Sequence, residues 1–277
     1  MFNNIKESYF SDDEFLNIKN VIKKGSNELF VAFDLQTLKT GILSKLDISE
    51  ILIIRDYYYK KEVEEFLKKV IENNSNNYKY IPLKIMKRFF QKENNPGFIV
   101  VFKQKSSSID MLDLTKNESY LVLNQIELPG NLGTILRSAN LFNIKNLILI
   151  DCKTSVYSNL VTQSSRGANM CFNIFNTSCD EFTNILNKDN QKNYNLYLCE
   201  PKCHNSLSYN KVKYNKNISN FICFGGERFG INKKLFDIES QIIHINQLHD
   251  INNSLNVSAA ASIILSNYFD FFSEAKL

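Results

Sequence analysis

The stretch PGNLGTILR, residues 129–137, follows an apolar run at residues 120–126 and places proline and glycine where a strand would give way to a helix. At such a junction the first backbone N–H groups of the helix have no partner within it and are free to bind a ligand. Asn131 is a good helix cap, and Arg137 lies nearly two helical turns beyond it. The pattern predicts a helix that begins at Asn131 and a polar site at its start. Capping alone would also explain Asn131, and a surface ion pair would explain Arg137.

Two further segments have the same character. GGERFG, residues 225–230, follows the apolar residues 221–224, and SLNVSAAA, residues 254–261, opens the last helical stretch. We expect the glycine pair to let a ligand lie against the backbone, and Ser254 to cap the last helix. Taken singly, a plain turn and ordinary close packing would explain these segments. The Rossmann and P-loop glycine patterns are absent, which leaves nicotinamide cofactors and nucleoside triphosphates without their usual support.

The order of apolar runs predicts an α/β protein with two domains. In the second part of the chain, strand-like runs at 120–126, 147–151, 172–175, 194–199, 221–224 and 242–245 alternate with helix-length segments, and a final helix spans 254–272. This alternation predicts a mostly parallel sheet whose ligands gather at the carboxyl ends of its strands. Residues 1–105 read as a small α/β domain, residues 106–117 as a linker, and residues 118–277 as the second domain.

Composition is that of a foldable chain. Hydrophobic residues make up 44% of the 277 residues and charged residues 22%. No apolar run is long enough to span a bilayer, so we expect a cytoplasmic protein with no membrane partner. The six cysteines form no compact framework, which favours reduced thiols. Cys199, Cys203 and His204 lack a second ligand pair, so no metal site is predicted.

Basic residues are concentrated between Lys79 and Lys105, where Glu93 is the one acid. Aromatic residues interleave with these charges, a composition suited to phosphate contact and base stacking. The stretch contains four candidate RNA-binding residues, namely Lys84, Lys87, Arg88 and Lys92. A solvated basic face over a few core aromatics would explain the same composition equally well.

Taken jointly, the three segments resemble the signature of the SpoU branch of the knotted SPOUT methyltransferases. The resemblance covers most of residues 118–272 and is specific through the order of its motifs. Ser165-Arg166-Gly167, the basic first part and the length look most like the thiostrepton- and nosiheptide-resistance ribosomal RNA methyltransferases, in which a ribosomal-protein-like domain comes first.

This resemblance implies a trefoil-knotted α/β domain, a homodimer, and transfer of a methyl group from S-adenosylmethionine to a ribose 2′-hydroxyl of RNA. It assigns the reaction to Arg137, Asn131 and Glu227, with the Asn131 side-chain amide expected to hold Glu227, and adds Arg166 to the RNA contacts. The residues it assigns to cofactor binding are Phe224, Gly225, Gly226, Gly230, Ile245, Ser254, Leu255, Asn256 and Val257.

Two departures from the family pattern bear on detail. Asn246 follows Ile245 where relatives often have proline, and Gln163 stands where many carry arginine. The leading substrate is 23S ribosomal RNA, with a transfer RNA as the alternative. A non-catalytic RNA-binding protein of the same fold is a further alternative, against which the joint presence of Asn131, Arg137, Glu227 and Asn256 argues.

Overall fold

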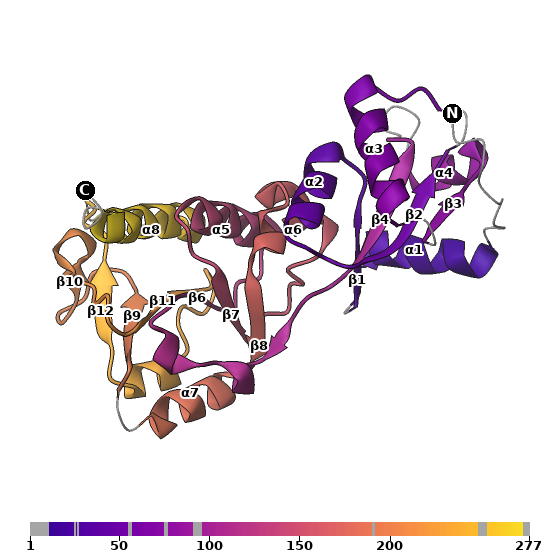
Figure 1. The fold of residues 1–277 in the computed structure, drawn as a ribbon. Coiled ribbons are helices and arrows are strands. Elements are labelled where there is room, and N and C mark those ends of the chain that lie inside the picture. Colours follow the sequence, from indigo (N-terminus) through magenta and orange to yellow (C-terminus); the bar gives the residue numbers. More distant parts are fainter. Residues whose placement is uncertain are drawn as a thin grey trace. The chain divides into compact units, whose positions relative to one another are not determined.

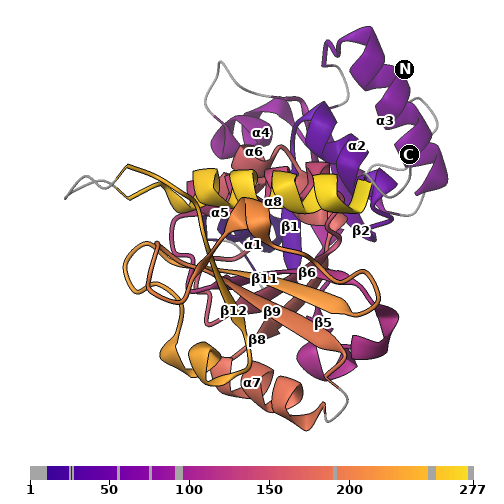
Figure 2. The same ribbon diagram turned by 90° about the vertical axis from the view of Figure 1, so that its left-hand side faces the viewer.

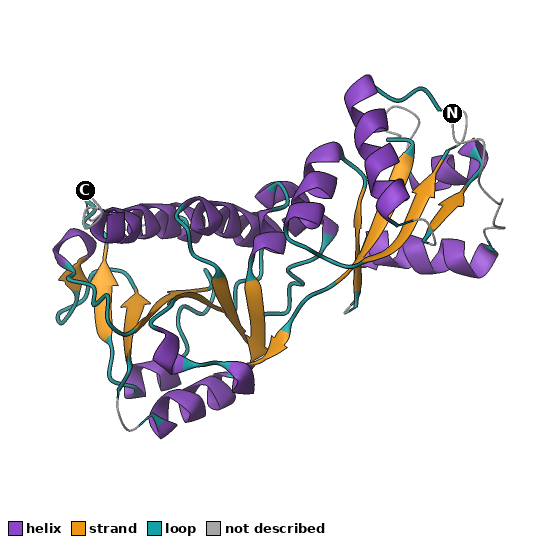
Figure 3. Cartoon of the chain, viewed as in Figure 1, coloured by secondary structure: helices purple, strands orange, loops and turns teal. Residues whose placement is uncertain are grey.

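The computed structural model describes residues 11–24, 26, 28–54, 57–74, 77–90, 96–189, 192–248 and 254–273. They fall into two compact units, whose elements are labelled in Figure 1 and coloured by type in Figure 3. Unit 1 takes the chain up to Gln104 together with Tyr157–Thr162, and unit 2 takes Lys105–Val156 and the chain from Gln163 onward.

Unit 1 contains a four-stranded sheet in the order β1-β4-β2-β3, in which only the β2–β3 pair is parallel. In α1 the apolar residues Phe15, Ile18 and Val21 recur every three positions, which gives the helix one buried face. The elements of unit 1 are α1 (Asp12–Lys24), β1 (Leu29–Ala32), α2 (Leu35–Leu43), β2 (Ile48–Ile53), α3 (Lys61–Asn73), β3 (Tyr78–Tyr80), α4 (Leu83–Phe89) and β4 (Phe98–Lys103).

Unit 2 is built on an eight-stranded sheet in the order β10-β12-β9-β11-β6-β7-β8-β5, with every pairing parallel. The predicted α/β fold with a mostly parallel sheet is therefore confirmed. Its elements are β5 (Ser107–Ser108), β6 (Ser119–Asn124), α5 (Pro129–Leu141), β7 (Asn146–Ile150), β8 (Asn173–Thr177), α7 (Cys179–Lys188), β9 (Tyr194–Cys199), β10 (Leu207–Ser208), β11 (Ser219–Gly225), β12 (Gln241–His244) and α8 (Val257–Ser273), with short 3-10 turns at Ile109–Met111, Leu114–Lys116, Ala168–Cys171, Tyr209–Lys211 and Lys233–Asp237. The helix α6 (Asn159–Ser165) is divided between the units, with residues up to Thr162 in unit 1 and the rest in unit 2.

Helices cover both faces of this sheet, as Figures 1 and 2 show for α5 and α8 on one face and α7 on the other. Phe182 and Leu186 of α7 pack with Phe221 of β11 in one buried cluster. α5 and α8 pack together, and Ser138 and Ser262 share a 2.7 Å hydrogen bond between them. The central strands are buried on both faces, which explains their continuous apolar runs.

The segment predicted as a linker is an ordered part of unit 2. Ser107 and Ser108 pair with Phe175 and Asn176 of β8, and Ile109 is buried in the main core. Three serines in a row suggested a flexible connection, yet serine is compatible with an edge strand when an apolar residue anchors the next turn. Sequence reading also missed α2, β3, α4 and β10, which are short.

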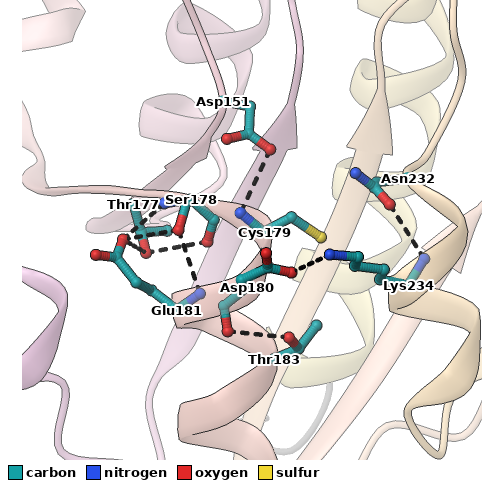
Figure 4. Close-up of polar contacts among 9 residues, drawn as sticks. All are labelled: Asp151, Thr177, Ser178, Cys179, Asp180, Glu181, Thr183, Asn232 and Lys234. Carbon is teal, nitrogen blue, oxygen red and sulfur yellow. Dashed lines mark hydrogen bonds and ion pairs between the residues drawn. The ribbon is translucent and has the colours of Figure 1, made fainter.

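A polar cluster ties the start of α7 to the chain near Asn232 (Figure 4). Ser178 and Glu181 form a reciprocal capping box at the helix start, and the Cys179 N–H donates to Asp151 Oδ2 at 3.3 Å. Asp180 forms an ion pair with Lys234, which follows the glycine segment 225–230. The cluster therefore helps to fix the chain that leaves that segment.

None of the helices in the described ranges combines the length and apolarity needed to cross a bilayer.

Candidate functional site

A pocket lies where β9, β11 and β12 end and α8 begins. Four chain segments form its wall. They are the end of β9, the end of β11 with the loop after it, the chain after β12, and the start of α8. The lining residues are Cys199, Glu200, Pro201, Phe224, Gly225, Gly226, Glu227, Gly230, Ile245, Gln247, Ser254, Leu255, Asn256, Val257, Ala260 and Ile264. All nine residues that the family resemblance assigned to the cofactor are among them.

The three signature segments meet through side-chain amides. Asn131 donates from Nδ2 to Glu227 Oε1, and Asn256 donates from Nδ2 to Asn131 Oδ1 at 3.3 Å. Two hydrogen bonds thus connect α5, the glycine loop and the start of α8. This geometry accounts for polar residues at all three places better than three independent local roles do.

The predicted helix caps are wrong in detail. α5 begins at Pro129 with Leu128 at the cap position, so Asn131 lies in the first turn, where its side chain is available to Glu227. For α8, Asn256 rather than Ser254 accepts the Ser258 N–H, at 2.8 Å. Proline is well suited to the first position of a helix, which moves the start of α5 ahead of Asn131.

Arg137 is not part of this hydrogen-bonded group. Its side chain is exposed, it does not line the pocket, and within the described ranges no hydrogen bond or ion pair reaches it. It lies six residues beyond Asn131 on α5, a rise of about 9 Å along the helix axis. Arg137 therefore lies on the exposed side of α5, outside the described pocket lining, and its role toward a ligand stays a prediction.

The glycines of the loop serve the chain's own packing. A Cβ at Gly226 would lie 2.1 Å from the Gln125 carbonyl oxygen, and a Cβ at Gly225 would lie 2.2 Å from the Gly230 carbonyl carbon. These glycines also line the pocket, so the expectation that a ligand lies against their backbone stays a prediction, and the structure adds a steric reason for glycine that comes from the chain itself. They allow the loop to pass directly against the β6–α5 connection and to fold back on itself, with Gly230 at φ +67.

Two residues that sequence reading missed hold the end of this loop. Glu200 accepts the Ile231 N–H through Oε1 at 3.1 Å, and the buried Asn124 accepts the Asn232 N–H at 2.7 Å. Burial raises the pKa of the Glu200 carboxyl, and its hydrogen bond to Ile231 opposes that effect. Glu200 stands just after the predicted strand 194–199, which is the signal that would have found it, whereas Asn124 lies within the predicted run 120–126 and ends the observed β6.

None of the described residues that were predicted to bind RNA lines this pocket. Lys84, Lys87 and Arg88 are exposed on α4, Arg166 is exposed after α6, and Lys92 lies outside the described residues. The Arg88 guanidinium lies over the Phe15 ring, 3.9 Å from its centroid, so packing within unit 1 already occupies it. Lys84 and Lys87 make no ion pair or aromatic contact with the residues that the structure describes.

The rest of the basic stretch fits the alternative interpretation. Lys79 forms ion pairs with Glu14 and with Glu50, the latter at 2.8 Å. Phe98 is buried, and Phe89 packs against the core of unit 1. These aromatic rings are structural, so base stacking by them is not supported.

Comparisons with known proteins agree on one family. The SpoU rRNA Methylase family profile matches residues 118–266. A Borreliella burgdorferi protein described as an uncharacterized tRNA/rRNA methyltransferase is 28% identical over 215 residues, which cover 74% of this chain and 90% of the relative.

Two solved structures share the fold along nearly the whole chain. The AdoMet-bound rRNA methyltransferase from Sinorhizobium meliloti superimposes with a TM-score of 0.78 at 19% identity, over 95% of this chain and 97% of the other. The SpoU methyltransferase AviRb from Streptomyces viridochromogenes, in complex with AdoMet, gives 0.77 at 15% identity, over 94% and 98%.

Proposed function

The chain belongs to the SpoU rRNA Methylase family, and we propose that it methylates a ribose 2′-hydroxyl of 23S ribosomal RNA. At the coarser level it is an RNA methyltransferase whose cofactor is S-adenosylmethionine. The observation that carries the proposal is the hydrogen-bonded connection of Asn131, Glu227 and Asn256 beside one pocket.

The pocket suits this cofactor by charge and shape. The lining residues that the structure describes include two carboxylates and no Lys, Arg or His, whereas a phosphate-bearing cofactor would call for cations. Ile245, Leu255 and Val257 provide apolar contacts for an adenine ring, and the loop at 224–226 provides backbone polar groups. When bound, the cofactor supplies a methyl group on a positively charged sulfonium sulfur.

The chain's own residues bind and orient the reactants. A guanidinium keeps its proton in proteins, so Arg137 acts as a donor to the ribose oxygen and a neighbouring phosphate and stabilises the charge that develops there. Asn131 positions the start of α5 against the loop, and Glu227 orients the Asn131 amide. Precise placement of the hydroxyl supplies much of the rate.

One experiment tests the substrate and the reaction together. The protein is incubated with methyl-labelled cofactor and separated ribosomal and transfer RNAs, and the modified ribose is mapped. Label on a 2′-oxygen of 23S RNA supports the proposal, and label on transfer RNA alone would replace the substrate. Absence of label on either RNA, with cofactor binding retained, would favour the non-catalytic RNA-binding alternative.

We propose that unit 1 captures the RNA through the exposed lysines of α4. Each phosphate contact contributes a slope of about −0.7 to −0.9 in log affinity against log salt. The Lys84→Ala, Lys87→Ala double variant should therefore lower the magnitude of that slope by about 1.4 to 1.8 and weaken RNA binding, with cofactor affinity unchanged. Filter binding over a salt series measures this.

A matched control removes the same charge elsewhere. Lys188 and Lys211 are exposed lysines of unit 2, and their double replacement by alanine should leave the slope unchanged. Equal slopes for all three proteins would show that the α4 lysines form only a solvated face.

The homodimer is likewise a proposal. Leu141 on α5 is 70% exposed, and Ile263 and Phe269 on α8 are 37% and 36% exposed, which gives the packed helix pair an apolar outer surface. We expect sedimentation at micromolar protein to show particles of twice the 32.1 kDa chain mass. Particles of the single-chain mass alone would contradict the dimer. The knot stays a prediction from the family.

A further inference from the structure

Glu200 is a carboxylate in the cofactor pocket that the proposed reaction does not use. It follows β9, lines the pocket and is half-buried, and Oε1 accepts the Ile231 N–H at 3.1 Å. This bond uses one lone pair of the carboxylate. Glu200 Oε2 has no hydrogen bond within the described ranges, so it remains an acceptor at the pocket wall.

The charged residues among the described lining of the pocket all have one sign. Among the described lining residues, the other carboxylate is Glu227, which already accepts a hydrogen bond from Asn131. The Cys199 thiol also lines the pocket, but burial raises its pKa well above the ordinary value, so it stays neutral. The described part of the pocket wall therefore carries negative charge and contributes no cationic side chain to balance it.

The two forms of the cofactor differ by one charge. S-adenosylmethionine carries a sulfonium, an ammonium and a carboxylate, so its net charge is positive, whereas the thioether product S-adenosylhomocysteine has lost the sulfonium charge and is neutral overall. A carboxylate in a partly desolvated wall attracts the first more than the second. The apolar and backbone contacts are the same for both forms and cannot distinguish them.

We propose that Glu200 is a specificity-determining residue that makes the pocket prefer the cationic methyl donor to its neutral product. The inference rests on the proposed cofactor site and adds a role for a residue outside the three signature segments. The preference favours release of the product and its exchange for fresh cofactor. The bond to Ile231 is a separate, positioning function of the same carboxylate.

Two variants separate charge from position. Glu200→Gln keeps an oxygen that can accept the Ile231 N–H and removes the charge. Glu200→Asp keeps the charge and shortens the side chain, which weakens that bond. The charge control is Asp237→Asn, because Asp237 is an exposed acid of unit 2 that does not line the pocket.

Calorimetry at pH 8 measures the dissociation constants of both cofactor forms for each protein. We expect Glu200→Gln to reduce the preference for S-adenosylmethionine on the order of tenfold. Glu200→Asp should keep the preference even if both forms bind less tightly, and Asp237→Asn should match the wild type. Should melting curves show that the Gln variant does not fold, Glu200→Ala against Glu200→Asp makes the same comparison.

An unchanged ratio of the two dissociation constants in Glu200→Gln would overturn the inference, whether both constants stay the same or weaken together. In that case the carboxylate acts only by holding the loop. Failure of the wild-type protein to bind either form would instead overturn the cofactor site itself, so the two failures are distinguishable.

Discussion

Replacing Arg137 by alanine is expected to slow methyl transfer by about 10² to 10³-fold, the usual effect of removing one donor to a developing charge. The dissociation constant of S-adenosylmethionine should not change, because Arg137 does not line the pocket and makes no hydrogen bond to the residues that do. Single-turnover assays with labelled cofactor measure the rate, and calorimetry measures the cofactor affinity.

Arg137→Lys is the informative comparison for this prediction. Lysine keeps the charge but loses the planar fork that can hold an oxygen and a phosphate at once, so we expect a rate between those of the wild type and the alanine variant. The residue is exposed on α5, so neither substitution should alter the melting temperature. Near-normal methyl transfer by the alanine variant would exclude the assigned role.

The sequence predicted the positions of the long strands because buried parallel strands have continuous apolar runs. Such runs at 221–224 and 120–126 correspond to β11 and β6, which pair in the middle of the sheet. The short elements, such as β10 with two residues, have no periodicity to detect. Local patterns therefore predicted the sheet and missed its edges.

The site residues could be predicted as a set, and one of their contacts could be predicted with the help of the family resemblance. Asn131 was expected to hold Glu227 through its side-chain amide, and that hydrogen bond is present across 96 positions of sequence, whereas its expected role as a helix cap is wrong. The aromatic residues of the basic stretch were open to two interpretations, and the burial of Phe98 decides for the core. Contacts between distant segments depend on tertiary packing, which periodicity and spacing do not encode.

The same limit applies to the glycines of the loop at 225–230. Glycine is required there because the loop passes directly against another segment of the chain, the β6–α5 connection. The sequence suggested that a ligand lies against Gly226, which lines the pocket, but it could not show that the Gln125 carbonyl oxygen occupies the space where a Cβ of residue 226 would stand. The Gly226 N–H donates to the Asn124 carbonyl at 2.9 Å, and the Gly226 carbonyl accepts the Gly230 N–H at 2.8 Å. The residue therefore fixes the loop at its entrance.

We expect Gly226→Ala to destabilise the protein by about 1 to 3 kcal/mol, the usual cost of forcing an extra group into a packed interior. The new Cβ would lie 2.1 Å from the Gln125 carbonyl oxygen, and a backbone group cannot rotate away as a side chain would. Relief requires the loop to move, which also displaces the cofactor-pocket wall. Melting and calorimetry should therefore show a lower melting temperature and weaker cofactor binding together.

Gly130→Ala is the matched control, because a Cβ at Gly130 meets nothing within 4 Å. Gly130 lies in the first turn of α5, where alanine is the better helix former, so this variant should be as stable as the wild type or gain up to about 1 kcal/mol. Both variants add one methyl group. In Gly226→Ala it lies against the backbone of another segment, and in Gly130→Ala it lies in open space. Wild-type stability and affinity in Gly226→Ala would mean that the loop tolerates displacement, and the glycine would then have no steric reason to be there.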